Sequence, residues 1–159
     1  MDIPWLRGLP YLDKNAYVNA HDLDLWEAKT AVHIQPGDAV VIRTGRWARR
    51  LKTGPWNAGV ETAGLDPSVL PWLKRRDVSI LGSETAQDAT PPPVGSELGP
   101  LALHDFALIV LGIHLMDDTN LEAISDAAAA RKRWEFLLVV APLPVRNGTG
   151  SPVNPIAVF

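Results

Sequence analysis

Short apolar runs separated by helix signals are the feature that most constrains the fold of this chain. Four runs have the length and apolar character of buried strands, and they cover residues 39–43, 78–82, 113–116 and 136–141. Segments with helical character lie between them. This alternation, with short connections, predicts an α/β fold in which helices flank a mixed β-sheet. No internal repeat is present.

The helix starts carry recognisable capping residues. Asn19 precedes a helix that runs to about residue 28, and Asp66–Pro67 precedes one that ends near Arg76. The pattern Thr119–x–x–Glu122 is typical of a capping box at the start of a helix through Ala130. The apolar residues 101–111 predict a further helix after a long loop rich in proline and glycine, and residues 1–18 are expected to be irregular.

The end of the chain predicts two strands joined by a loop. The run 136–141 and the closing residues 155–159 are apolar enough for strands buried on both faces, and Pro142 and Pro144 end the first. Residues 147–152 between them are rich in Gly, Ser and Thr. Their backbone N–H groups are suited to binding a ligand. A tight connection at a sheet edge is an equally good interpretation.

Composition excludes several classes of function. The 159 residues fit one domain with a substantial core, and the net charge of −3, without a basic stripe, argues against nucleic-acid binding. The absence of cysteine excludes disulfides, thiolate zinc sites and a cysteine nucleophile. No apolar run reaches membrane-spanning length, and the first residues do not form a signal peptide. We therefore expect a cytoplasmic protein.

Polar residues that follow the predicted strands are the candidates for chemistry. Glu84 and Asp88 follow one strand, and Asp117 and Asp118 follow the next, so all four can meet at one edge of the sheet. His104 opens the apolar helix that follows the long loop. A histidine with several carboxylates suits a divalent metal or general acid–base catalysis. An ordinary polar surface is the alternative.

Several segments taken together resemble one family. They are residues 34–47 (IQPGDAVVIRTGRW), 79–88 (SILGSETAQD), 102–124 (ALHDFALIVLGIHLMDDTNLEAI) and 133–159 (RWEFLLVVAPLPVRNGTGSPVNPIAVF). The resemblance is to the cyclase family of metal-dependent hydrolases, which includes bacterial kynurenine formamidase and isatin hydrolase. It implies an α/β fold, a homodimer with active sites near the subunit interface, and hydrolysis of an amide or lactam.

The chain departs from this family in one respect. It lacks the HxGTHxDxPxH-type motif that supplies most of the metal ligands in the family's first half. Residues 1–159 are therefore expected to form a single domain equivalent to the C-terminal half. The resemblance places His104 at a metal-ligating histidine and Asp117, with Asp118 as second choice, near a ligating glutamate. Two ligands are too few for zinc, so zinc or manganese is expected only if a partner supplies the motif.

Three hypotheses about function follow. In the first, the chain is a truncated, metal-independent enzyme that catalyses ring closure, isomerisation or dehydration of a small biosynthetic intermediate. In the second, it is a metal-dependent amide or lactam hydrolase completed by an N-terminal-half chain, and in the third it is a non-catalytic binding or scaffold protein. The intact helix caps favour a folded product, and a homodimer or a complementary chain is the expected assembly.

The first hypothesis assigns roles to particular residues. His104 is the general acid or base, and Glu84 and Asp88 orient or assist it. Trp47 and Trp56 form walls of the substrate pocket. Backbone groups of the loop are expected to hold a carbonyl oxygen, with Thr149, Gly150 and Ser151 as the substrate-binding residues.

Overall fold

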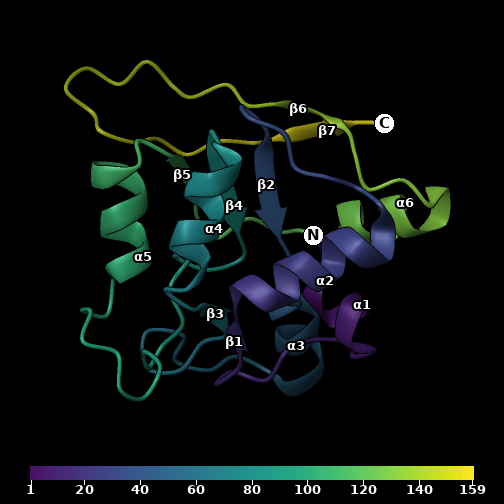
Figure 1. Ribbon diagram of the computed structural model, residues 1–159, viewed down its shortest axis with the longest axis horizontal. Helices are drawn as coiled ribbons and strands as arrows, with labels where there is room; N and C mark the ends of the chain where they lie inside the picture. Colours follow the sequence, from purple (N-terminus) through teal and green to yellow (C-terminus); the bar gives the residue numbers. More distant parts are fainter.

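A three-stranded parallel sheet lies at the centre of the computed structural model, which describes residues 1–159 (Figure 1). Its strands are β2 (Ala39–Ile42), β4 (Ile80–Ser83) and β5 (His114–Met116), in the order β2-β4-β5. Val40 pairs with Leu81, and Leu81 pairs with Leu115. Because the strands are parallel, the loops that leave them all begin at the same edge of the sheet. The predicted α/β class is confirmed, whereas the sheet is parallel and not mixed as predicted.

One face of this sheet carries the main core. Val40, Ile42 and Leu81 point to that face and pack with apolar side chains of α2 (Ala20–Thr30), α4 (Val69–Arg76) and α5 (Ala102–Asp105). Helix α5 continues directly into η1, a π-helix over Phe106–Val110. The apolar spacing of these helices and the Asn19–Asp22 capping box of α2 account for their positions.

Helix α6 (Glu122–Arg131) covers part of the opposite face. Its predicted capping box is wrong. The Thr119 hydroxyl donates to the Ser83 carbonyl (2.6 Å), and the Glu122 carboxylate forms an ion pair with Arg43 (2.7 Å). Long-range partners at the sheet edge therefore replace the local reciprocal bonds that the sequence pattern predicts.

The prolines and glycines of the first eighteen residues predicted an irregular segment, and this prediction is wrong. The segment contains α1 (Ile3–Arg7), capped by the Asp2 side chain, and β1 (Tyr17–Val18). Strand β1 pairs in parallel with β3 (Gly64–Leu65), and α3 (Arg46–Thr53) follows β2. The pairing partner of β1 lies far along the chain, which explains why a local pattern does not reveal so short a strand.

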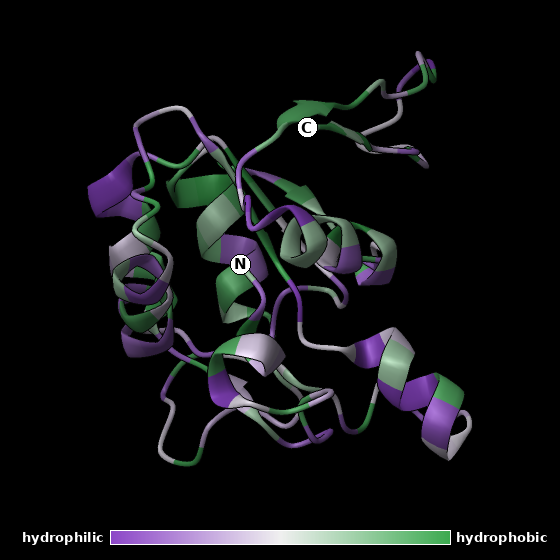
Figure 2. Cartoon of the chain, turned by 90° about the vertical axis from the view of Figure 1, so that its right-hand side faces the viewer, coloured by the Kyte–Doolittle hydropathy of each residue, from purple (hydrophilic) through white to green (hydrophobic).

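The last two strands exist as predicted, but they are not buried. Strands β6 (Leu137–Val139) and β7 (Ile156–Val158) form a separate antiparallel ribbon, and Leu137 and Ile156 are 66% and 55% exposed. Residues 141–150 form an exposed arm between the strands. Figure 2 shows the ribbon and arm projecting from the rest of the molecule. The strands are apolar, but nothing in the described chain packs on their outer face.

None of the helices is long and apolar enough to cross a membrane.

Candidate active site

The loops that leave the carboxyl edge of the parallel sheet are tied to one another. The loop after β4 receives hydrogen bonds from the loop after β5, where the Asp118 N–H donates to the Thr85 carbonyl (3.2 Å). Arg46, at the start of α3, donates to the Glu84 carbonyl (2.6 Å) and forms an ion pair with Asp118. The predicted convergence of the acidic residues at this edge is therefore observed.

His104 and Asp117 form a pair at this edge. Nε2 of His104 lies 3.7 Å from Oδ2 of Asp117, and both side chains are partly exposed, at 26% and 36%. The other ring nitrogen, Nδ1, lies 3.4 Å from the Ala86 carbonyl oxygen. The structure thus brings together a histidine from α5 and a carboxylate from the end of β5.

The surroundings of the imidazole ring define what the pair can do. Both partners of the ring, the Ala86 carbonyl oxygen and the Asp117 carboxylate, are hydrogen-bond acceptors, whereas a neutral imidazole carries a hydrogen on only one of its two nitrogens. One ring nitrogen of the neutral form therefore faces an acceptor without a hydrogen between them. Two acceptors facing each other are stabilised when a proton or a cation lies between them. The pair is therefore suited to accepting a proton, or to contributing two ligands to a metal ion.

Asp88 supports the pair through the backbone. Its Oδ1 accepts from the Leu103 N–H (2.8 Å) and its Oδ2 from the His104 N–H (3.1 Å). These bonds satisfy two free donors in the first turn of α5, where the Leu101 N-cap supplies no side-chain bond. Burial raises the pKa of the Asp88 carboxyl above its ordinary value, although both N–H groups oppose the shift.

Glu84 contacts α3 instead of His104. Its Oε2 accepts from the backbone N–H groups of Thr44 (2.9 Å), Gly45 (2.6 Å) and Arg46 (3.1 Å), and from the Thr44 hydroxyl. The side chain is completely buried, and Oε1 has no hydrogen-bond partner. Burial raises the pKa of Glu84, and the backbone bonds only partly oppose it.

The two tryptophans expected in the pocket donate to backbone carbonyls and do not contact His104 through a hydrogen bond. The Trp47 indole donates to the Thr119 carbonyl (2.8 Å), and the Trp56 indole donates to the Glu61 carbonyl (2.7 Å). The Arg49 guanidinium lies 4.5 Å from the Trp56 ring centre, and both residues line a cavity of about 10 Å³. No hydrogen bond or ion pair joins either tryptophan to His104.

Thr149, Gly150 and Ser151 are not brought to this site. Thr149 and Gly150 lie on the exposed arm, and Ser151 follows it, where its hydroxyl accepts from the Leu143 N–H of the arm (3.0 Å). In Figure 1 the arm runs past the end of the sheet opposite to the one at which β2 and β4 end. Within one chain, the arm and His104 are at different ends of the molecule.

The residues present do not complete a metal site. No group of three or more His, Cys, Asp or Glu side chains could hold an ion. His104 and Asp117 supply two donors of suitable chemistry, whereas zinc takes three or four protein ligands. The metal that the family resemblance implies therefore does not fit the described chain by itself.

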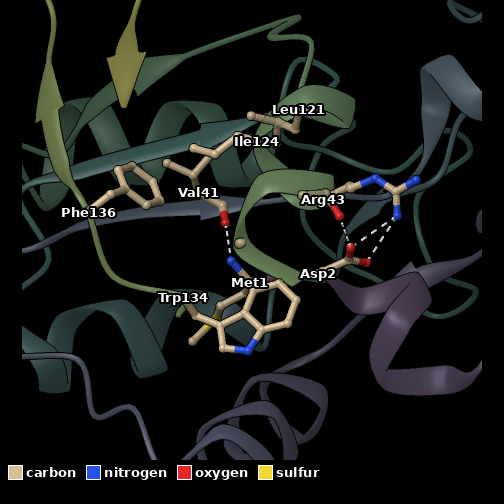
Figure 3. Close-up of a pocket in the computed structure, with 10 residues that line it drawn as sticks. Met1, Asp2, Val41, Arg43, Leu121, Ile124, Trp134 and Phe136 are labelled. Atoms are coloured by element: carbon tan, nitrogen blue, oxygen red, sulfur yellow. Dashed lines mark hydrogen bonds and ion pairs between the residues drawn. The ribbon is translucent and has the colours of Figure 1, made fainter. Parts of the chain in front are cut away.

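A mostly apolar cavity lies on the other face of the sheet (Figure 3). Val41, Trp134 and Phe136 line it with side chains of α6, and its polar end holds Asp2 and Arg43, which are 3.1 Å apart. Its volume is about 40 Å³, enough for a few waters and too small for a substrate. The Met1 amine donates to the Val41 carbonyl here (2.5 Å), and burial lowers its pKa to about 5. No candidate residue lines this cavity.

Gln87 is a residue of the site that the sequence did not reveal. It is completely buried, and its side-chain amide donates to Oδ1 of Asp117 (3.0 Å) and to the Met116 carbonyl (3.1 Å). The acidic residues on either side of it, Glu84 and Asp88, are predicted as site residues because carboxylates take part in metal binding and proton transfer. A glutamine in a polar loop carries no comparable signal in a single sequence.

Comparisons with known proteins agree with this fold. The family described as Putative cyclase matches residues 9–88. A solved structure described as a novel cyclase is 26% identical, with a TM-score of 0.85 over 99% of this chain and 52% of that chain. Isatin hydrolase A from Ralstonia solanacearum is 22% identical, with a TM-score of 0.70 over 92% of this chain and 55% of that chain.

An isatin hydrolase bound to the product analogue thioisatinate is 24% identical, with a TM-score of 0.68 over 91% of this chain and 53% of that chain. A search of curated proteins found no match. The chain thus spans about half the length of these solved structures. Because the family match covers half of the chain and the fold agrees throughout, the chain belongs to the Putative cyclase family.

Proposed function

We propose that this chain is a cyclase-family enzyme whose acid–base chemistry is carried out by His104 with Asp117. The main support for this proposal is the distance of 3.7 Å between Nε2 of His104 and Oδ2 of Asp117, together with the contact of Nδ1 with the Ala86 carbonyl oxygen. Nε2 can accept a proton from the attacking water or amine, and the imidazolium, stabilised by Asp117, returns that proton to the group that leaves the carbonyl carbon: the ring amine in hydrolysis, or water in ring closure. General acid–base catalysis of this kind contributes about 10²–10⁴-fold to a rate.

A lactam or its ring-opened acid is the substrate class that we infer. Two of the structures compared above are isatin hydrolases, and isatin is a lactam. Ring closure is the reverse of lactam hydrolysis, so one acid–base pair serves either direction. Asp88 and Glu84 act at a distance from the substrate in this proposal, because their carboxylates hold the first turns of α5 and α3.

Substitution of the pair tests the proposal. Purified protein is assayed with isatin and with its ring-opened acid, with and without a chelator. We expect His104→Ala and Asp117→Ala each to lower turnover by about 100-fold. His114→Ala is the matched control, because His114 is an exposed histidine at the opposite end of β5. Full turnover by His104→Ala would show that the assignment is wrong.

A metal-dependent amide or lactam hydrolase is the second candidate, and the uncovered ribbon favours it. The chain of the similar cyclase structure is about twice as long as the part that this chain covers. The β6–β7 ribbon exposes an apolar face that further polypeptide can cover. In this proposal the family's other half supplies the remaining ligands to His104 and Asp117. Metal analysis distinguishes the candidates: stoichiometric zinc or manganese, together with loss of activity on chelation, supports the second.

A further inference from the structure

We propose that Gln87 is the positioning residue of the pair, because its amide holds the Asp117 carboxylate in the orientation that directs Oδ2 toward His104. This inference rests on the proposed acid–base function and deepens it. The Gln87 amide nitrogen binds Oδ1 of Asp117 at 3.0 Å, which leaves Oδ2 as the oxygen 3.7 Å from the imidazole.

The chemistry of the contacts fixes which way the Gln87 amide faces. Its two neighbours, the Met116 carbonyl and the Asp117 carboxylate, are both acceptors, so the NH₂ group must point to them. The amide oxygen is left buried with no partner. An unpaired buried oxygen destabilises a fold, and an apolar side chain of similar size would avoid that cost. The two donors are therefore the property that distinguishes this glutamine.

Gln87 belongs to a three-residue support for both members of the pair. The Ala86 carbonyl contacts Nδ1 of His104, the Gln87 amide binds Asp117, and the Asp88 carboxylate binds the His104 backbone. Gln87 also adopts a left-handed backbone conformation, with φ of 64°. That conformation is costly for a residue other than glycine and is often found where structure supports function.

The test measures the Asp117 carboxyl and His104 imidazole signals by NMR at one pH. It compares the native protein with Gln87→Met, which keeps the size of the side chain and removes both donors. We expect Gln87→Met to shift the Asp117 carboxyl carbon, and to shift the His104 Nε2 signal in the direction seen in Asp117→Ala. Adding Gln87→Met to Asp117→Ala should change the His104 signal no further.

Kinetics provide a second readout that separates positioning from general stability. With isatin as the probe, Gln87→Met should lower kcat about tenfold with KM within about twofold, and should have no effect in an Asp117→Ala background. Gln87→Leu, which also removes both donors, should show the same loss and serves if Gln87→Met does not fold.

The outcomes distinguish this inference from the function on which it rests. Unchanged Asp117 and His104 signals in both Gln87 variants would overturn the positioning role, whatever the activity. If Asp117→Ala leaves the His104 signal unchanged while Gln87→Met still shifts the Asp117 carboxyl, the proposed acid–base pair is wrong. A kinetic loss that persists in the Asp117→Ala background would also overturn the positioning role.

Discussion

Two buried carboxylates hold the loops at the carboxyl edge of the parallel sheet through backbone hydrogen bonds. Glu84 and Asp88 stand at the ends of strands, where acids often carry chemistry, yet each binds backbone N–H groups at the start of a helix. Glu84 is fully buried and accepts four hydrogen bonds on one oxygen. Its contribution as described is to anchor the segment that joins β2 to α3.

Glu84 should make the stability of the protein fall as the pH rises through the mildly acidic range. Burial raises the pKa of Glu84 above 4.5, its ordinary value, in the folded state. At pH values between the pKa of the unfolded chain and the raised pKa of the folded protein, the folded protein therefore binds more protons than the unfolded chain. The free energy of unfolding therefore decreases with rising pH across that window. Burial also raises the pKa of Asp88 above its ordinary value of 3.8, so Asp88 likewise makes the free energy of unfolding decrease as the pH rises.

Glu84→Gln should remove part of this slope, because the amide keeps an acceptor oxygen and does not titrate. Urea unfolding measured at intervals between about pH 4 and pH 8 checks the prediction. Asp126→Asn is the matched control, since Asp126 is exposed on α6. An identical slope in Glu84→Gln and in the native protein would contradict it.

At the scale of elements, helix α5 depends on a side chain from outside itself. Asp88→Ala removes the acceptor for the N–H groups of Leu103 and His104, and we expect a loss of about 1–3 kcal/mol of unfolding free energy. Because His104 lies in the affected turn, kcat on isatin should also fall. Asp88→Asn, which keeps one oxygen, should lose less. An Asp88→Ala protein as stable as the native one would show that the cap is dispensable.

Most helices and central strands were predictable because their signals are local. Asn19 and the apolar spacing locate α2, and the runs that form β2, β4 and β5 bounded the sheet correctly. The Thr119 capping box failed because distant partners compete for the same groups. The prediction that the last two strands are buried was wrong for another reason. An apolar pattern shows that a strand can be covered, but the covering group lies elsewhere in space.

The site was predictable only in part. Strand-end position and the family resemblance predicted His104 and Asp117 as candidate residues, and the structure places these two side chains together. The orientation of the His104 ring and of the Asp117 carboxylate was not predictable, because it depends on contacts with Gln87 and with the Ala86 carbonyl. Neither has a sequence signature. Loop conformation and burial create their roles, and both emerge only after the chain has folded.

At the scale of the whole molecule, the parallel sheet and the β6–β7 ribbon are unequally covered. Leu137 pairs with Val158 and Val139 with Ile156, so four apolar side chains share one face of the ribbon. All four are at least 44% exposed, and residues 137–159 contain Arg146 as their only charged residue. Each strand also has an unpaired edge. Natural proteins usually protect such edges with charge or with a covering segment.

This exposed face should make the isolated chain self-associate. Apolar patches and free strand edges associate when nothing covers them, and the ribbon lacks the charges that would oppose contact between copies. In sedimentation velocity we expect an average mass above the 17.3 kDa of one chain, increasing with concentration. The double variant Leu137→Lys/Ile156→Lys should sediment as a single chain, because like charges on this face repel.

Leu51→Lys provides the matched control for the added charge. Leu51 is 90% exposed on α3, away from the ribbon, so this variant should associate like the native protein. Near-native circular dichroism of the double variant is also expected, because the ribbon contributes nothing to the main core. A native chain that is monomeric at every concentration, or a double variant that associates unchanged, would show that this face does not bind a second copy. In the latter case association must use another surface, such as the exposed apolar residues Ile109 and Val110 of η1.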